Sequence, residues 1–255
     1  AVLQALEERH LFVYLPDAGP AGDAIHAAGW DGALREGAGD YLMVVDANLG
    51  FNKASPYVTE ALSYTVDLRD IGRPQAELII EHAHTVPAGA IVCDHTPRYD
   101  LTYEQMMRRC YWDYVRVYAP EGSQLLEATR HPVPGELLVT GLGRDGDAEV
   151  LSGEVDKTTF ATLLVLAPGE RVETRFVYDL PPGTVNQEGD VWRYSLTIQK
   201  QGGAGEHKVS VTLILPPGAE VISSSPPPSA RAGSTLSYEL SSRTDVELKV
   251  RLQVP

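Results

Sequence analysis

The sequence predicts a mainly β fold, with a small α+β first half followed by an immunoglobulin-like β-sandwich. Short apolar segments alternate with polar residues at a period of two, Pro and Gly separate these segments, and helical periodicity is absent after residue 124. We expect an α+β sheet domain over residues 1–155 and a sandwich domain over residues 156–255. The strands expected after residue 124 are Leu125–Ala128, Leu137–Thr140, Glu149–Leu151, Thr159–Leu166, Val172–Tyr178, Trp192–Gln199, His207–Leu215, Thr235–Leu240 and Val246–Val254.

The first half combines helices with strands that are expected to pair as an antiparallel sheet, on which a short helix packs. Gly, Pro or Asp lies at one or both ends of most of these elements. The expected elements are a helix end over residues 1–9, a strand at Leu11–Leu15, a helix at Gly22–Ala28, and strands at Asp40–Val45, Tyr57–Leu68 and Ala76–Val86.

The segment from Cys93 to Pro120 contains both cysteines. Thr102 and Gln105 have the spacing of a capping box, which predicts that a helix begins there. One apolar stripe follows at helical spacing and points Cys110 inward. From Asp113 the period changes to two, so a strand is expected up to Pro120.

The two cysteines favour a disulfide between Cys93 and Cys110, which would stabilise the fold by about 3 kcal/mol. The alternative is two buried thiols in a reduced protein. A catalytic cysteine is disfavoured, because Cys110 faces the predicted core.

Charge and hydropathy exclude some classes of protein. The formal net charge of −14 argues against a nucleic-acid partner, whose phosphates require a basic face. No apolar run approaches the roughly 20 residues that span a bilayer, and the N-terminus lacks the order of a signal peptide. For an exported protein, we expect the signal or membrane anchor upstream, and Ala1 in place of Met fits a processed or trimmed product.

Two histidines form a candidate metal site. His82 and His84 are two residues apart on a predicted strand, so their side chains share one face, as in His-x-His metal pairs. His95 or Asp94 could supply a third ligand. The alternative is a pair of solvent-facing histidines without a metal.

A polar turn forms a second candidate metal site. Asp46, Asn48 and Asn52 place oxygen donors at alternate positions around Gly50, as calcium loops do. The distal bidentate carboxylate of an EF-hand is absent from the turn. The alternative is an Asx-rich turn whose side chains bond their own backbone.

Basic residues are concentrated in one part of this acidic chain, where guanidinium groups could bind a phosphate or carboxylate. The alternative is a solvated face paired with Asp94, Glu104 and Asp113. The basic residues are Lys53, Arg98, Arg108, Arg109, Arg116 and Arg130.

No Gly-x-Ser-x-Gly nucleophile motif is present, and we predict no cofactor.

Four segments together resemble the bacterial family known as domain of unknown function 4012. They are GWDG from Gly29, DYLMVVDANLGFNKA from Asp40, CYWDYVRVYAPEGSQL from Cys110 and RYSLTIQKQGG from Arg193. The resemblance covers about residues 10–220 and implies a cell-surface or envelope protein whose larger relatives carry an amino-terminal membrane anchor. It implies no reaction and no catalytic residue.

These observations together predict a non-enzymatic, extracellular structural or assembly protein of the bacterial cell surface. Its expected partners are copies of itself or other envelope proteins, with a membrane reached only through an anchor upstream of this sequence. The alternative is an envelope glycan- or lipid-phosphate-binding protein that uses Arg98, Arg108, Arg109 and Arg116.

Overall fold

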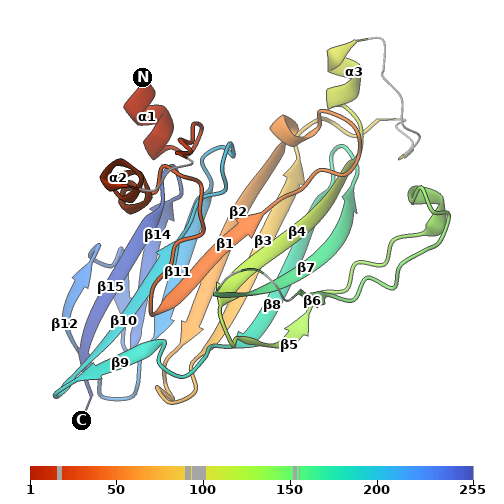
Figure 1. Ribbon diagram of the computed structural model, residues 1–255. Coiled ribbons are helices and arrows are strands. Elements are labelled where there is room, and N and C mark those ends of the chain that lie inside the picture. Colours follow the sequence, from red (N-terminus) through yellow and green to blue (C-terminus); the bar gives the residue numbers. More distant parts are fainter. Residues whose placement is uncertain (16–18, 90–92, 94–101, 152–153, 155, 255) are drawn as a thin grey trace.

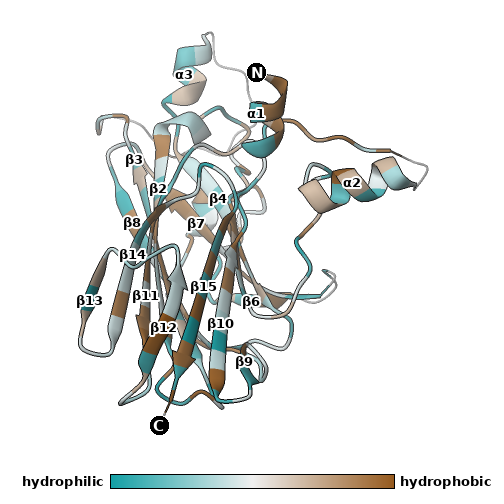
Figure 2. Cartoon of the chain, turned by 90° about the vertical axis from the view of Figure 1, so that its left-hand side faces the viewer, coloured by the Kyte–Doolittle hydropathy of each residue, from teal (hydrophilic) through white to brown (hydrophobic). Residues whose placement is uncertain are grey.

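Alternating strands form two sheets that pack face to face in the computed structural model (Figure 1). The structure describes residues 1–15, 19–89, 93, 102–151, 154 and 156–254. The prediction of a mainly β fold is confirmed across these residues. Apolar and polar residues alternate along strands such as β15 (Figure 2). The apolar positions at every second residue of β10 and β15 belong to the hydrophobic core.

The first sheet has β1 and β4 near its centre. Its strand order is β12-β15-β10-β1-β4-β7-β6, and β9 also pairs with β10. The bounds are β12 Glu220–Ser225, β15 Val246–Gln253, β10 Val191–Ile198, β1 Asp40–Val45, β4 Tyr111–Pro120, β7 Lys157–Leu166, β6 Glu149–Leu151 and β9 Val185–Glu188.

The second sheet has the order β13-β14-β11-β2-β3-β8-β5. The predicted antiparallel pairing of the strands at residues 58–67 and 75–84 is confirmed. The bounds are β13 Ala230–Ala232, β14 Thr235–Ser241, β11 Lys208–Ile214, β2 Val58–Asp67, β3 Gln75–His84, β8 Arg171–Asp179 and β5 Gln124–Ala128.

Parallel pairs join distant parts of the chain in both sheets. β1 pairs in parallel with β10, and β2 pairs in parallel with β11. The predicted domain boundary at residues 155/156 falls between β6 and β7, which are neighbours in the first sheet. Strands from both sides of that boundary therefore contribute to each sheet.

The hydrophobic core fills the space between the two sheets. Phe160 on β7 packs against Phe176 and Tyr178 on β8, with ring centroids 6.3 and 5.1 Å apart. All three rings are fully buried. Burial of large side chains such as these contributes about 2 kcal/mol each and is the main force that holds the sheets together.

Among the residues that the structure describes, three short α-helices lie outside the sandwich: α1 Val2–Glu7, α2 Pro20–Ala28 and α3 Tyr103–Met107. The predicted capping box of α3 is confirmed, because Gln105 N donates to Thr102 Oγ1 at 3.2 Å and Thr102 N donates to Gln105 Oε1 at 3.1 Å. Gly29 ends α2 in the left-handed conformation that glycine tolerates best. α1 and α3 lie at the same end of the sandwich, away from the C-terminus (Figures 1 and 2).

Some element predictions were wrong. α3 ends at Met107, and β4 already begins at Tyr111, so the helical stripe is shorter than expected. The segment predicted as a strand at Leu137–Thr140 forms the 3-10 turn Gly135–Leu137 and further tight turns, because Gly135 approaches the backbone of Gly141 too closely for any other residue. Leu11–Leu15 is not a strand either. The backbone N–H of Val13 donates to the Trp30 carbonyl and that of Leu11 to the Ala5 carbonyl, and neither partner belongs to a strand.

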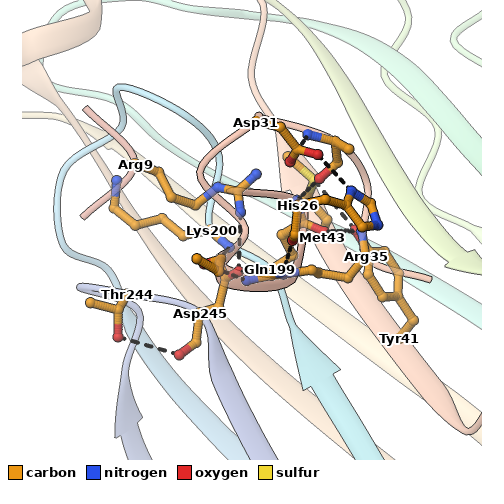
Figure 3. A network of polar contacts seen from close by, with 12 residues as sticks. Arg9, His26, Asp31, Arg35, Tyr41, Met43, Gln199, Lys200, Thr244 and Asp245 are labelled. Atoms are coloured by element: carbon orange, nitrogen blue, oxygen red, sulfur yellow. Dashed lines mark hydrogen bonds and ion pairs between the residues drawn. The ribbon is translucent and has the colours of Figure 1, made fainter. Parts of the chain in front are cut away.

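Asp245 anchors the N-terminal segment to the first sheet (Figure 3). Its Oδ2 accepts hydrogen bonds from Arg9 Nη1 at 3.1 Å and Arg35 Nε at 3.4 Å, while Oδ1 accepts from the backbone N–H of Lys200 at 3.0 Å. Gln199 Oε1 accepts from the backbone of Arg35 and from the hydroxyl of Tyr41. The helices before β1 are thereby held against the loops that follow β10 and β14.

No helix in the described part of the chain is both long enough and apolar enough to cross a membrane.

Candidate functional site: an interior carboxylate and imidazole cluster

Four polar side chains converge between the sheets, at the end of the sandwich that carries α3. Asp46 directly follows β1 and Asp113 lies on β4, both in the first sheet; Glu60 lies on β2 and His82 on β3, both in the second. Glu60, His82 and Asp113 occupy inward-facing positions of their strands. Asp46 continues the alternation of inward and outward side chains one residue beyond the end of β1. Glu60 and His82 are direct cross-strand partners. We call these four residues the interior cluster.

The interior cluster is centred on Nε2 of His82. This atom lies 3.3 Å from Asp46 Oδ1, 3.5 Å from Glu60 Oε2 and 3.6 Å from Asp113 Oδ2. The ligating atoms of Asp46, Glu60 and His82 all lie within 4.8 Å of one another. The other oxygen of Asp113 accepts a hydrogen bond from the backbone N–H of Ala47 at 2.9 Å, which fixes the carboxyl group in place.

The interior cluster is largely enclosed by protein. The side chains of His82 and Asp113 are fully buried, that of Glu60 is 7% exposed, and that of Asp46 is 17% exposed. Beside Glu60 lies a cavity of about 20 Å³, which is also lined by His207, whose Nδ1 is 3.5 Å from Glu60 Oε1. A cavity of this size holds about one water molecule.

Burial and mutual repulsion shift the protonation of these groups. Burial raises the pKa of Asp113 well above its usual value, and the charge of Asp46 raises it further. Burial, followed by the charge of Asp46, raises the pKa of Glu60 to about 7. Burial alone would lower the pKa of His82, but its contacts with Asp46 and Glu60 raise it well above the usual value. Below about pH 7, a charged Asp46–His82 pair beside two neutral carboxyl groups is therefore favoured without a bound cation.

Two buried atoms of the interior cluster lack hydrogen-bond partners within the described residues. They are Asp113 Oδ2 and Nδ1 of His82. A buried polar atom without a hydrogen-bond partner costs about 1–3 kcal/mol. Both atoms lie where the acidic residues of the two sheets meet, so the interior cluster is destabilised at this point.

The structure brings together residues from both predicted metal sites. His82 and Asp46 meet, but His84 does not join them. Nε2 of His84 donates to the Arg109 carbonyl at 2.9 Å, and its Nδ1 accepts from Val86 N. The other suggested ligands, Asp94 and His95, lie outside the described residues.

The predicted calcium turn is an Asx-rich turn in which two asparagines bond neighbouring groups. Asn48 Oδ1 accepts from Gly50 N at 2.9 Å. Asn52 Nδ2 donates to the Cys110 carbonyl at 2.8 Å, and its Oδ1 accepts from Ala54 N at 2.9 Å. These contacts match the alternative of a self-bonded turn, with Asp46 directed into the interior cluster instead.

The predicted arginine group is spread over different surroundings. Arg108 pairs with Glu104 at 2.7 Å, whereas Arg109 is buried. Arg116 lies 3.9 Å from Glu154 and over the ring of Tyr118. Arg98 lies outside the described residues. Asp113, expected at a solvated basic face, is instead fully buried because it occupies an inward position of β4.

The disulfide between Cys93 and Cys110 is confirmed, with a sulfur–sulfur distance of 2.05 Å. Cys110 is buried immediately before β4. Its carbonyl accepts the hydrogen bond from Asn52, so the disulfide, the turn after β1 and the start of β4 are linked.

A second buried carboxyl group, Asp40, lies at the opposite end of β1. It accepts hydrogen bonds from the hydroxyl of Tyr64 at 2.9 Å and of Tyr194 at 2.7 Å. The hydroxyl of Tyr178 donates to that of Tyr64 at 3.2 Å. Burial raises the pKa of Asp40 to about 6, although the tyrosine hydroxyls oppose this shift.

Three buried acids were missed as site residues: Asp40, Glu60 and Asp113. Each interrupts the apolar phase of an alternating strand, as Glu60 does two residues before the inward-facing Leu62. A charged residue at an inward position has to find a partner in the interior. An acidic residue at a position that is otherwise apolar in an alternating strand was therefore the sequence signal for these three residues.

The sequence matches no family model and no curated protein. One similar solved structure is the "putative nutrient binding protein" of Legionella pneumophila, at 9% identity and a TM-score of 0.43, covering 85% of this chain and 72% of that one. Another is an M1 zinc metallopeptidase from Deinococcus radiodurans, at 11% identity and a TM-score of 0.32, covering 80% of this chain and 45% of that one. We therefore base the proposed function on the residues of this chain and their geometry.

Proposed function

We propose that the chain is a non-enzymatic structural or assembly protein of the extracytoplasmic bacterial cell surface. The enclosure of the interior cluster carries this proposal. A catalytic acid or base must come within about 3 Å of the group it serves. His82 and Asp113 are fully buried, and the adjoining cavity of about 20 Å³ has room for about one water molecule. These residues are suited to hold the two sheets together rather than to contact a substrate.

The Cys93–Cys110 disulfide supports the extracytoplasmic location, because structural disulfides persist in oxidising compartments. The resemblance to domain of unknown function family 4012 supports the same location. Three of its four segments contribute β1, β4 and β10, which lie in the middle of the first sheet. These segments also supply Asp40, Asp46 and Asp113.

Edge strands are poorly suited to addition of a further chain. β6 and β13 have three residues each, and β5 and β12 contain register shifts. Short or bulged edges disfavour edge-to-edge pairing. Contacts between copies are therefore expected to use side chains.

Apolar side chains are exposed at the end of the sandwich that carries the disulfide. Leu49 in the turn after β1 is 52% exposed, and Tyr103 at the start of α3 is 59% exposed. The backbone N–H of Lys53 donates to the Met106 carbonyl at 3.3 Å, which joins this turn to α3. We place the contact between copies of the chain at this surface.

Sedimentation velocity over a range of protein concentrations tests assembly. The wild-type chain is expected to self-associate, and Leu49→Glu to remain monomeric. Val139→Glu is the matched control, because Val139 is 69% exposed on the loop after β5. A wild-type chain that stays monomeric at high concentration would contradict self-assembly, as would equal effects of the two substitutions.

Labelling of intact cells tests the location. A reagent that cannot cross membranes should modify the protein on the producing cells, and mass spectrometry should find the Cys93–Cys110 disulfide intact. Protein confined to the cytosol with two reduced thiols would refute the extracytoplasmic assignment.

A further inference from the structure

The interior cluster has the donor set of a metal site that spans both sheets. We propose that Asp46, Glu60, His82 and Asp113 bind one small divalent transition-metal cation, with zinc as the representative ion. Two ligands would come from the first sheet and two from the second. This inference goes beyond a role in assembly and does not depend on it.

The distances fit this coordination. Tetrahedral zinc binds nitrogen and oxygen ligands at about 2.0–2.2 Å, so adjacent ligand atoms lie roughly 3.3 Å apart or slightly more. The three carboxylate oxygens lie 3.3, 3.5 and 3.6 Å from Nε2 of His82. The ligand atoms of Asp46, Glu60 and His82 also lie within 4.8 Å of one another, so these three residues could share a cation, and Asp113 would complete the set by moving toward them.

The third carboxylate oxygen, that of Asp113, has an unsatisfied position. Oδ2 of Asp113 is buried, has no hydrogen-bond partner within the described residues, and faces Nε2 of His82. Its companion Oδ1 is held by the backbone N–H of Ala47, so the carboxyl group cannot simply turn away. The unpartnered oxygen therefore stays beside His82, and a cation bound there would satisfy it.

Charge complementarity favours a cation at this position. Three carboxyl groups and a single imidazole meet in the interior, and buried charges need a compensating partner or a metal. When all three carboxyl groups are ionised they outnumber the single imidazole, and a divalent ion would balance them. The cavity beside Glu60 and His207 could supply one water molecule as a further ligand.

The donor types select the class of cation. One imidazole nitrogen with carboxylate oxygens suits zinc or manganese, whereas calcium prefers six to eight oxygen ligands. The enclosure of the interior cluster resembles a structural metal site, in which the protein supplies all four ligands. Its expected effect is to cross-link the two sheets.

Calorimetric titration of the chelator-treated full chain tests the proposal, with Zn²⁺, Mn²⁺ and Ca²⁺ as separate probes. One equivalent of Zn²⁺ is expected to bind more tightly than Ca²⁺. Glu60→Gln and Asp113→Asn preserve side-chain size and should each weaken Zn²⁺ binding at least about tenfold, because even supporting residues of zinc sites have effects of that size. Circular dichroism confirms folding of each variant.

Two matched variants serve as controls. Asp40→Asn removes another buried carboxyl group, and His84→Gln removes the neighbouring inward-facing histidine. Both should retain wild-type Zn²⁺ affinity. Absence of saturable Zn²⁺ binding to the folded wild-type chain would overturn the proposal, as would unchanged affinity in both Glu60→Gln and Asp113→Asn. If those variants fail to fold, the wild-type melting temperature must rise with Zn²⁺ concentration, and a constant melting temperature refutes the site.

Discussion

The hydroxyl of Tyr194 donates a 2.7 Å hydrogen bond to Asp40, and the two residues lie on neighbouring parallel strands of the first sheet. Asp40 is also hydrogen-bonded to Tyr64 of the second sheet. The carboxyl group thus joins the sheets from inside the core. Because Asp40 is buried, its charged form is unfavourable in the folded chain. The free energy of unfolding should therefore depend on the protonation of Asp40.

Asp40 should make folding stability depend on pH. Burial raises the pKa of Asp40 from 3.8 to about 6 in the folded chain. Its contribution to the free energy of unfolding is therefore fully present below pH 4 and is lost as the pH rises through 6. The loss should be about 3 kcal/mol. Urea denaturation across this range should show a loss in wild type that is larger by this amount than the loss in Asp40→Asn, in which Glu60 and Asp113 still contribute.

Asp179 provides the control for this pH dependence. Its pKa is lowered, chiefly by the hydrogen bond from Arg73, so its stabilising effect is present above pH 4 and is lost as the pH falls. The Asp179→Asn variant should retain the wild-type loss between pH 4 and 6. A wild-type and an Asp40→Asn chain with parallel pH profiles would contradict the role given to Asp40.

Breaking the disulfide should destabilise the fold. The Cys93–Cys110 link closes a loop with a sequence separation of 17, so replacing both cysteines with Ala should cost about 3 kcal/mol. Denaturant titration measures the loss. A reducing agent should lower the wild-type midpoint similarly and leave the double variant unchanged. An unaltered wild-type midpoint after complete reduction would argue against this stabilising role.

Much of the strand content could be predicted from local alternation, since the side-chain period is a property of a few adjacent residues. The capping box at Thr102 and Gln105 was equally local and was confirmed. The turns around Gly135 were predicted as a strand because their backbone contacts with Gly141 and Gly143 are not evident from side-chain pattern.

The interior cluster could be predicted only in part. His82 and Asp46 were recognised as possible ligands, but of separate sites. Their meeting depends on how the sheets are ordered and stacked, and the parallel pairing of β1 with β10 joins residues about 150 positions apart in sequence. Glu60 and Asp113 each occupy a position that is otherwise apolar in an alternating strand, and this local pattern could have indicated them.

Loss of the Asp245 charge should loosen the N-terminal segment. Asp245 accepts hydrogen bonds from Arg9, whose side chain is 3% exposed, and from Arg35. Asp245→Asn would leave the Arg9 guanidinium buried without its counter-charge and should cost about 1–3 kcal/mol. Hydrogen exchange should accelerate in α1 while the central strands stay protected.

Glu247→Gln is the control for this experiment. Glu247 is largely exposed, and its ion pair with Lys249 should contribute at most about 1 kcal/mol. This variant should leave exchange in α1 unchanged. If Asp245→Asn also leaves it unchanged, the proposed anchoring is wrong.

Asn52→Asp distinguishes a self-bonded turn from a calcium loop. Asn52 Nδ2 donates to the Cys110 carbonyl at 2.8 Å, and a carboxylate would face that oxygen without a proton to share. The substitution should destabilise the fold by about 1–3 kcal/mol, and added Ca²⁺ should not restore the loss. Thermal denaturation with and without Ca²⁺ measures both effects. Restoration by Ca²⁺ would favour the calcium interpretation instead.

Anomalous X-ray scattering from crystals of the full chain soaked with Zn²⁺ tests the central claim most directly. The account predicts a strong peak between the sheets, within about 2.2 Å of Nε2 of His82 and of the Asp46, Glu60 and Asp113 carboxylates. His26 provides an internal comparison, because it pairs with Asp31 on the exposed surface. Peaks confined to surface residues such as His26, with none inside the interior cluster, would contradict the account.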